Sequence, residues 1–320
     1  MVQTRVLPYG PEAIAAAARL VGRGFPVAVP TETVYGLAAD AANGEAVARI
    51  YEAKGRPAFN PLIVHVLNVD QAADLAAFNA AARSLAERWW PGPLTLVLPL
   101  RPGSGIASLV TAGLPTIAVR APAHRAMRDL LIATGKPLAA PSANPSGRIS
   151  PTRAEHVRDG LRGRIRLIVD DGPTRHGLES TIVAVDGDKL RLLRPGPVDL
   201  GLKLAAAGEI RSPGQLASHY APSKPLRLEA SSAEPGEWLI GFGAVEGDAT
   251  LSASGDLVEA AATLFDRLHE AERQPQPRIA VAPVPDEGLG AAINDRLRRA
   301  AAGRRNVYAG GSAGGALGPA

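Results

Sequence analysis

The spacing of apolar positions predicts strands interleaved with helices over the first part of the chain. Apolar residues recur at helical spacing over residues 12–21 and 45–54, and one or two further helices fit residues 70–90. Short apolar runs bounded by proline, glycine or polar residues predict strands at 26–30, 61–66, 94–98, 116–119, 138–140, 167–169, 181–185 and 190–193. This order of elements predicts an α/β fold with a twisted sheet of mixed strand direction.

A second, smaller pattern follows a stretch that has no periodicity. The cluster Arg194-Pro195-Gly196-Pro197 breaks the first pattern, and residues 212–225 are rich in proline, serine and glycine. Strands at 238–242 and 278–282, with helices that end near residues 273 and 301, then predict a small Rossmann-like α/β domain. We therefore expect domains at 1–205 and 226–308, a linker at 206–225, and a disordered tail rich in glycine and alanine at 309–320.

Composition narrows the possible chemistry. Hydrophobic residues make up 46% of the chain and charged residues 21%, so the chain can form a packed core. There is no cysteine, which excludes disulfides, thiolate metal sites and cysteine nucleophiles. Neither a secretory signal nor a membrane-spanning apolar stretch is visible, so we expect a cytoplasmic protein without membrane contact. The net charge of +4 is compatible with RNA or nucleotide binding, and equally with an ordinary basic surface.

The standard motifs of nucleotide binding and nucleophilic catalysis are absent or misplaced. No GxxxxGK[ST] motif occurs, and the scattered histidines show no zinc-binding spacing, so we expect no protein-bound metal. The GxSxG pattern at 310–314 lies in the expected tail, without the strand that a nucleophile elbow requires.

Four other segments combine polar groups with the ends of predicted elements. In the segment 30–37, Thr33 follows a buried strand, where a ligand could bind or where threonine could simply cap a turn. In the segment 54–62, Lys54 and Arg56 end a helix. They could clamp an anion, or they could only complement the helix dipole.

The third and fourth segments follow the same principle. Arg120 ends an apolar strand, and Ser142 and Asn144 come just after another, although serine, asparagine and proline are also common in plain turns. The fourth group contains Glu179-Ser180-Thr181-Ile182, Arg194-Pro195-Gly196 and His219-Tyr220-Ala221-Pro222, each of them weak when taken singly.

Taken together, these segments carry a family resemblance. The matching pieces are PTETVYGL from Pro30, KGRPAFNPL from Lys54, PGPLT from Pro91, VRAP from Val119, APSANPSG from Ala140, ESTI from Glu179 and RPGP from Arg194. They resemble, in order and content, the YrdC-like L-threonylcarbamoyladenylate synthase family. The SPG…HYAP linker and the α/β region after it resemble the two-domain form of that family.

The resemblance implies a concave basic cavity and a reaction among bound small molecules. L-Threonine, bicarbonate and ATP would give threonylcarbamoyl-AMP and pyrophosphate, the first step in threonylcarbamoyl-adenosine modification of tRNA. The carbamate oxygen would attack the α-phosphate, so no protein nucleophile is needed. Mg²⁺ would arrive with ATP. The product would pass to a downstream tRNA-modifying transferase complex, and a weak RNA contact is compatible with the charge.

The resemblance also implies roles for individual residues. The catalytic set would be Lys54, Arg56, Ser142 and Asn144. L-Threonine would contact Thr33, His65, Arg120, Ala140 and Ser180, and ATP would contact Arg56, Asn60, Thr116, Ser142, Ser150, Arg194 and Tyr220. The linker would act as a lid, with His219 and Tyr220 closing over the nucleotide.

Two other functions remain open from the sequence. An RNA-binding or translation-associated protein of the same fold could use the basic face without any chemistry. The related domain of hydrogenase-maturation carbamoyltransferases is the second alternative, but those proteins carry zinc-finger regions, for which this chain has no cysteine.

Overall fold

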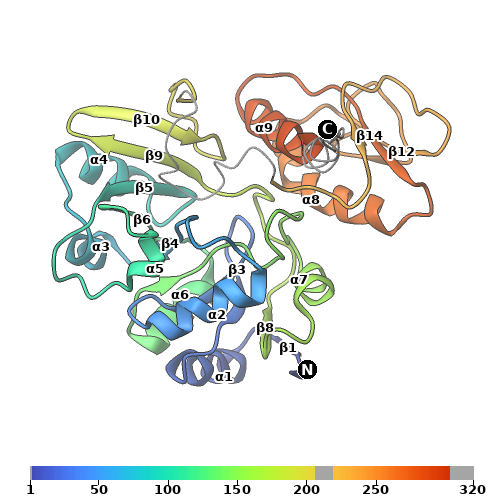
Figure 1. Cartoon of the computed structure of the whole chain (residues 1–320). Helices are drawn as coiled ribbons and strands as arrows, with labels where there is room; N and C mark the ends of the chain where they lie inside the picture. Colours follow the sequence, from blue (N-terminus) through green and yellow to red (C-terminus); the bar gives the residue numbers. More distant parts are fainter. Residues whose placement is uncertain (1, 206–218, 303–320) are drawn as a thin grey trace, which may run out of the picture.

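A computed structural model of the chain describes residues 2–205 and 219–302. Two regions lie side by side in Figure 1, one coloured blue to yellow and the other orange to red. The first is built on a ten-stranded sheet and the second on a four-stranded sheet. Among the described residues, no helix combines the length and the hydrophobicity that a membrane crossing requires.

The large sheet mixes parallel and antiparallel pairs, as the sequence predicts. Its strand order is β1-β8-β2-β3-β7-β4-β6-β5-β9-β10. The strands are β1 (Arg5–Pro8), β2 (Val27–Pro30), β3 (Tyr35–Asp40), β4 (Ile63–His65), β5 (Leu94–Pro99), β6 (Thr116–Arg120), β7 (Leu138–Ala139), β8 (Leu167–Asp170), β9 (Thr181–Asp186) and β10 (Lys189–Arg194). Strands β4 and β6 are parallel, whereas β5 runs antiparallel to β6. The predicted mixed α/β fold is therefore confirmed.

Seven helices accompany this sheet in the described part of the first region. They are α1 (Pro11–Gly22), α2 (Gly44–Lys54), α3 (Val69–Leu75), α4 (Ala80–Trp89), α5 (Ser108–Thr111), α6 (Arg125–Thr134) and α7 (Ala154–Leu161). Local chemistry sets the ends of α2. The Asn43 side chain accepts a hydrogen bond from the Ala46 N–H at the start, and Gly55 ends the helix with a left-handed φ of 61°. Because α2 ends at this point, Lys54 and Arg56 lie next to the sheet.

The second region is a four-stranded parallel sheet with two long helices. Its strands are β11 (Leu226–Arg227), β12 (Glu237–Gly241), β13 (Ala249–Thr250) and β14 (Arg278–Val281), in the order β11-β14-β12-β13. Its helices are α8 (Leu257–Arg273) and α9 (Leu289–Ala302). All three strand pairs are parallel, as expected for a Rossmann-like α/β unit. The boundaries of the two domains stay a prediction.

Several elements were not predicted from the sequence. These are β1, β3, α5, α6, α7, β11 and β13, whereas the interval 70–90 holds two helices. Most of the predicted linker, at 206–218, lies outside the described residues. The predicted tail at 309–320, with its GxSxG pattern, also lies outside them.

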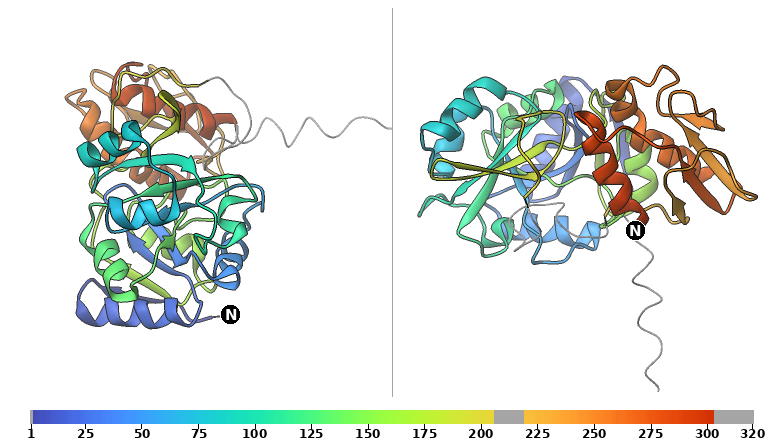
Figure 2. Two further views of the ribbon diagram at one scale, coloured as in Figure 1. Left: turned by 90° about the vertical axis from the view of Figure 1, so that its left-hand side faces the viewer. Right: turned by 90° about the horizontal axis from the view of Figure 1, so that it is seen from above.

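The two regions share a hydrophobic cluster. Val34, Ile149, Leu178 and Tyr220 pack in one cluster with the buried faces of α8 and α9. Figures 1 and 2 show α9 on the side of the second region that faces the first. Residues of α8 and α9, which come late in the chain, therefore pack against the first region and cover part of its surface.

Two stacked histidines cross this interface. His156 of α7 and His269 of α8 lie with ring centroids 3.8 Å apart and planes 15° apart. Burial, with smaller contributions from His269 and nearby arginines, lowers the pKa of His156 to about 3. Burial also lowers the pKa of His269 to about 4. Both rings are therefore neutral near neutral pH.

We expect this stack to make the fold sensitive to acid. Below about pH 6.5 the unfolded chain protonates His156 while the folded protein does not, so stability falls as the pH is lowered. At about pH 5 this residue alone costs about 2 kcal/mol of unfolding free energy. Urea unfolding of wild type and His156→Gln at about pH 7 and pH 5 measures the effect. The variant should lose less stability on acidification, and equal losses would contradict the prediction.

Candidate active site

A cavity lies at one edge of the large sheet. Strands β4 and β6 end there side by side, because His65 and Arg120 are register partners. Strand β9 starts at the same edge, since it is parallel to β5. The cavity contains about 540 Å³ of space, part of it open to solvent. Its lining residues are Thr31, Thr33, Val34, Gly36, Arg56, Ile63, His65, Arg120, Ala140, Pro141, Ser142, Glu179, Ser180, Arg194, His219 and Tyr220.

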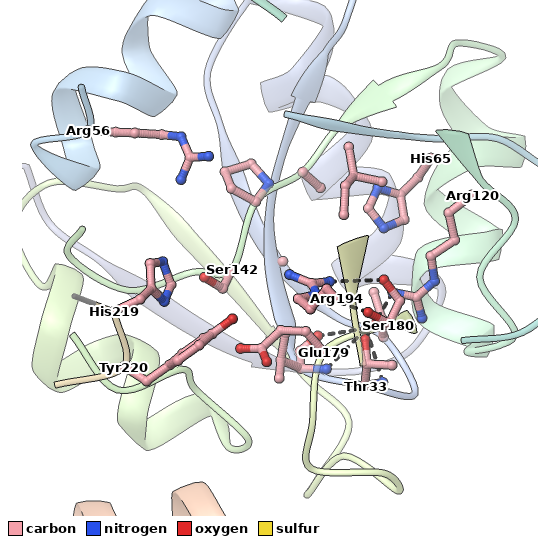
Figure 3. A pocket seen from close by; sticks show the side chains of 16 residues that line it. Thr33, Arg56, His65, Arg120, Ser142, Glu179, Ser180, Arg194, His219 and Tyr220 are labelled. Atoms are coloured by element: carbon pink, nitrogen blue, oxygen red, sulfur yellow. Dashed lines mark hydrogen bonds between the residues drawn. The ribbon is translucent and has the colours of Figure 1, made fainter. Parts of the chain in front are cut away.

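Arg120 is fixed at one end of the cavity (Figure 3). Its Nη2 donates to Glu32 Oε1 at 2.5 Å, its Nη1 to Thr33 Oγ1 at 3.0 Å and its Nε to the Gly92 carbonyl at 3.1 Å. Burial acts to raise the pKa of Glu32, but Arg120 outweighs it and holds that pKa below its usual range. Three of the five N–H donors of Arg120 are thus used, and the other two have no partner in the described part of the chain, so this end can accept a carboxylate.

His65 lies next to Arg120 and is uncharged. Burial, followed by the positive charge of Arg120, lowers the pKa of His65 to about 3. Its Nδ1 is buried and has no partner among the described residues. Because buried polar atoms are normally hydrogen-bonded, this nitrogen is available to a polar ligand group.

Ser180 and Arg194 form the next part of the wall. Arg194 Nε donates to the Ser180 carbonyl at 3.0 Å, and its Nη2 donates to Ser180 Oγ at 3.1 Å. The Ser180 hydroxyl also shares a hydrogen bond with Thr95 Oγ1 at 2.7 Å. Gly196 allows this close packing, since a Cβ there would come within 2.5 Å of the Thr181 nitrogen and 2.7 Å of the Glu179 oxygen.

Arg56, His219 and Tyr220 lie at the opposite end of the cavity (Figure 3). Arg56 donates to the carbonyls of Asn60 and Pro61 at 3.1 and 2.8 Å. Burial lowers the pKa of Arg56 to about 10, so its guanidinium remains charged at neutral pH. Burial also lowers the pKa of His219, and neighbouring cations add to this effect. At neutral pH this end of the cavity therefore holds one fixed cation, Arg56, and two neutral side chains, His219 and Tyr220.

Several buried polar atoms without partners lie at this end. They include Asn60 Nδ2 and Oδ1, His219 Nδ1 and the Tyr220 hydroxyl. Each lacks a hydrogen-bond partner among the described residues, which is costly unless a ligand or water supplies one. The region is therefore suited to a polar ligand.

Lys54 lies behind the cavity wall. Its Nζ donates to the Ser142 and Asn144 carbonyls at 2.6 and 2.5 Å. Burial, followed by the charge of Arg56, lowers the pKa of Lys54 well below its ordinary value. Asn144 Nδ2 in turn donates to the Arg148 carbonyl at 2.7 Å. These bonds hold the loop that presents Ser142 to the cavity.

The cavity brings together nine of the residues singled out from the sequence. The residues in its lining are Thr33, Arg56, His65, Arg120, Ala140, Ser142, Ser180, Arg194 and Tyr220. Five others are not in the lining: Lys54, Asn60, Thr116, Asn144 and Ser150. Thr116 starts β6 and so lies at the other end of that strand from Arg120. Ser150 donates its hydroxyl to Glu179.

Two acidic residues of the site were not assigned a role from the sequence. Glu32 orients Arg120, and Glu179 lines the cavity. Both lie inside segments that the sequence analysis quotes, PTETVYGL and ESTI, but nothing in the local pattern distinguishes them from surface carboxylates. Their burial, 5% and 6% exposed, is the distinguishing property.

The cavity is positively lined. In the part of the chain that the structure describes, three arginines face it, against the single carboxylate of Glu179, so it suits anionic ligands. Among the described residues, no group of three or more histidine, aspartate and glutamate side chains could hold a metal ion. The lining offers cations and oriented donors, which stabilise developing negative charge.

Sequence comparison identifies the family. Residues 19–196 match the Sua5_yciO_yrdC family, described as "Telomere recombination", and residues 180–302 match Sua5_C, described as "Threonylcarbamoyl-AMP synthase, C-terminal domain". The threonylcarbamoyl-AMP synthase of Bacillus subtilis is 42% identical over 91% of this chain and 93% of its own. The one from Pyrococcus abyssi is 40% identical over 89% and 92%.

Solved structures agree with this result. The crystal structure of P. abyssi Sua5 complexed with L-threonine has a TM-score of 0.85 and 37% identity, covering 95% of this chain and 98% of that one. A variant of P. abyssi Sua5 with an adjacent histidine and tyrosine replaced by alanine also has a TM-score of 0.85, at 36% identity over 94% and 97%. The chain therefore belongs to the Sua5/YciO/YrdC family, in the two-domain form of threonylcarbamoyl-AMP synthases.

Proposed function

We propose that the protein makes threonylcarbamoyl-AMP from L-threonine, bicarbonate and ATP. The threonine amine attacks the bicarbonate carbon and water leaves. An oxygen of the resulting carbamate then attacks the α-phosphorus, the bond to the β-phosphate breaks, and pyrophosphate departs. The observation that carries this proposal is the cavity itself, where three buried arginines and several unpartnered polar atoms line one hollow. Such a site can hold several anions close together, and positioning accounts for most of its catalysis.

The amino acid would bind at the Arg120 end. The two free N–H donors of Arg120 suit its carboxylate, and Thr33, Ala140 and Ser180 surround the same end. The neutral ring of His65 can hydrogen-bond the substrate without repelling its ammonium group. Threonine binding at these five residues is a prediction that the geometry supports.

ATP would bind at the Arg56 end. Arg56 and Arg194 supply positive charge toward phosphate, and Ser142, Asn60 and Tyr220 supply polar groups. Roles for Ser150 and Thr116 also stay predictions. Ser150 would act through Glu179, whereas a contact with Thr116 would require ATP to reach the far end of β6.

Mg²⁺ would enter with ATP as part of the substrate. Glu179 is the only carboxylate among the described lining residues, and its two oxygens already accept from Ser150 and Arg296. The donor set therefore fits an ion that is held by phosphate oxygens, where it neutralises the triphosphate.

The predicted linker would act as a lid. Its described end places Tyr220 against the cavity at 1% exposure, with the left-handed φ of 64° that non-glycine residues seldom adopt. The next residue, Ala221, donates to the Gly147 carbonyl at 2.8 Å, which ties the linker to the loop that carries Ser142. A lid at this point would keep water from the adenylate.

We expect Tyr220→Ala to uncouple the reaction. Loss of the ring should raise KM for ATP about tenfold and raise the ratio of pyrophosphate to threonylcarbamoyl-AMP, because water reaches the intermediates. Tyr220→Phe separates the two contributions of this residue, since it keeps the ring that covers the site and loses only the hydroxyl proposed to bond ATP, so its product ratio should stay near wild type. Quantifying both products from each variant tests the lid, and a ratio near one in the alanine variant would reject it.

The cellular compartment and the fate of the product are also proposals. The protein would act in the cytoplasm and pass its product to a tRNA-modifying transferase complex, since a mixed anhydride of AMP is an activated donor that must be consumed by group transfer. RNA binding without chemistry is the alternative reading. It gives no use for an oriented arginine beside a neutral histidine at the bottom of a small cavity.

A single incubation tests the proposal. Purified protein with ATP, Mg²⁺, bicarbonate and isotope-labelled threonine should yield labelled threonylcarbamoyl-AMP by mass spectrometry, together with pyrophosphate, in the absence of RNA. Omission of threonine or bicarbonate should abolish both products. Pyrophosphate release that is independent of threonine, or no adenylate at all, would exclude this function.

A further inference from the structure

Helix α9 of the second region inserts an arginine into the wall of the cavity. Arg296 has no solvent exposure and is among the largest fully buried side chains of the described residues. Its Nε donates to Glu179 Oε2 at 3.0 Å, and its Nη1 donates to the Pro195 carbonyl at 2.7 Å. Asp295 also accepts from its Nη1 at 3.0 Å. A buried arginine with this many bonds has one fixed position.

Glu179 is the partner that connects Arg296 to the site. Within residues 2–205 and 219–302, it is the only acidic residue in the lining of a cavity that is otherwise built for anions. Its second oxygen accepts from the Ser150 hydroxyl, so both oxygens are occupied. Figure 3 shows the Glu179 carboxylate between Tyr220 and Arg194, on the side where ATP would bind. Without a nearby cation, this carboxylate would repel a triphosphate.

The second region also holds the ring of Tyr220. The Arg296 guanidinium lies 5.5 Å from the centroid of that ring, and the Phe265 ring of α8 packs beside it with the ring centroids 5.5 Å apart and the planes 31° apart. Tyr220 thus belongs to the hydrophobic cluster of α8 and α9. The position of the predicted lid residue is therefore set by the second region.

We propose that Arg296 is a positioning residue for the reaction, which neutralises Glu179 and seats Tyr220 so that the C-terminal α/β region completes the ATP end of the cavity. The proposal rests on the proposed function. It assigns the second region a part in nucleotide binding, through charge compensation inside the first region. Burial acts to lower the pKa of Arg296, but Tyr220, Glu179 and Asp295 raise it, so the guanidinium stays charged.

A purely structural tie between the two regions is the competing interpretation. It predicts that loss of Arg296 lowers stability and the active fraction while KM for each substrate stays the same. Charge compensation predicts a rise in KM for ATP alone, since Arg296 has no contact with the Arg120 end. The ratio of the two KM changes therefore separates the interpretations.

The experiment uses the full chain with Arg296→Met, Glu179→Gln and the double variant. At about pH 8, Arg296→Met should raise KM and the dissociation constant for ATP about 10- to 30-fold, with KM for threonine changed less than about twofold. The double variant should recover most of the ATP affinity, because no charge remains to repel the nucleotide. Arg298→Met is the matched control, on the same helix but with a side chain 58% exposed.

Several results would overturn the inference. These are unchanged ATP affinity in Arg296→Met, equal rises in both KM values, or no recovery in the double variant. If the methionine variant does not fold, Arg296→Lys serves instead. A lysine lacks the planar guanidinium that bonds Glu179 Oε2 from Nε and the Pro195 carbonyl from Nη1, so it should raise the ATP dissociation constant about threefold or more. ATP binding by calorimetry needs no turnover. A wild-type protein that makes no adenylate would therefore reject the proposed function. The inference about Arg296 would still be tested by the ATP affinities of wild type and variants.

Discussion

Replacement of Arg120 by glutamine is expected to lower kcat/KM for L-threonine about 100- to 1,000-fold, with KM for ATP changed less than about twofold. The arginine side chain is 4% exposed, and a charge-assisted, two-pronged bond to a carboxylate in such a site is strong. Arg120→Lys should recover little, because a single ammonium cannot keep Glu32, Thr33 and a substrate carboxylate together. Steady-state kinetics with each substrate varied separately measures the split.

Two further variants make this result interpretable. Glu32→Gln keeps Arg120 but removes the charge that orients it, so it should cost about tenfold in kcat/KM for threonine. Arg125→Gln removes an exposed arginine of the same region, 68% exposed at its side chain, and should leave kinetics near wild type. If Arg120→Gln instead raised KM for ATP and spared threonine, the two ends of the cavity would have to be exchanged.

Much of the fold could be predicted because its central strands are short, apolar and bounded by proline or polar residues. Segments such as 26–30 and 181–185 show this pattern, and the strands β2 and β9 follow it closely. Strand β3 was missed because its sequence, YGLAAD, is rich in alanine and contains glycine, which have low strand propensity. Pairing with β2 and β7 decides its conformation, and such long-range pairing has no local signal.

Helix α6 is a different case, because the sequence does carry its signal. Met127, Leu130 and Leu131 repeat at helical spacing, all three are buried, and Gly135 ends the helix with a left-handed φ. Helix α7 is short, and its buried face depends on packing against β8, so its pattern is weaker.

The site could be predicted as a set of residues, but their individual roles could not. Cations, hydroxyls and amides that follow strand ends indicate a binding site, and most of them do face one cavity. Sequence cannot show which way a side chain points, so Lys54 and Arg56 looked alike, although only Arg56 lines the hollow. Arg296 had no signal at all, since its partner Glu179 is 117 residues away along the chain.

Lys54 gives the second large effect. We expect Lys54→Met to lower kcat about 100-fold or more and to destabilise the fold by about 2–4 kcal/mol. The residue is 3% exposed, and its amine satisfies the Ser142 and Asn144 carbonyls, which would be left buried without a donor. The loop would then lose the position from which Ser142 faces the cavity, and a displacement of about 1 Å is enough to slow a reaction that depends on positioning. Urea unfolding and steady-state kinetics of the same preparation measure both losses.

A double-mutant cycle distinguishes this loop-holding role from direct contact with a phosphate. Asn144→Ala removes the other anchor of the loop, the bond from Nδ2 to the Arg148 carbonyl. If Lys54 acts by holding the loop, its loss in the Asn144→Ala background should add little, because the loop has already moved. If Lys54 touches the triphosphate, the two losses should multiply, and KM for ATP should rise without a matching loss of stability. Lys136→Met, a half-exposed lysine paired with Asp40, is the matched control and should leave KM for ATP unchanged. Multiplying losses would return Lys54 to the substrate contact that its place in the KGRPAFNPL segment first indicated.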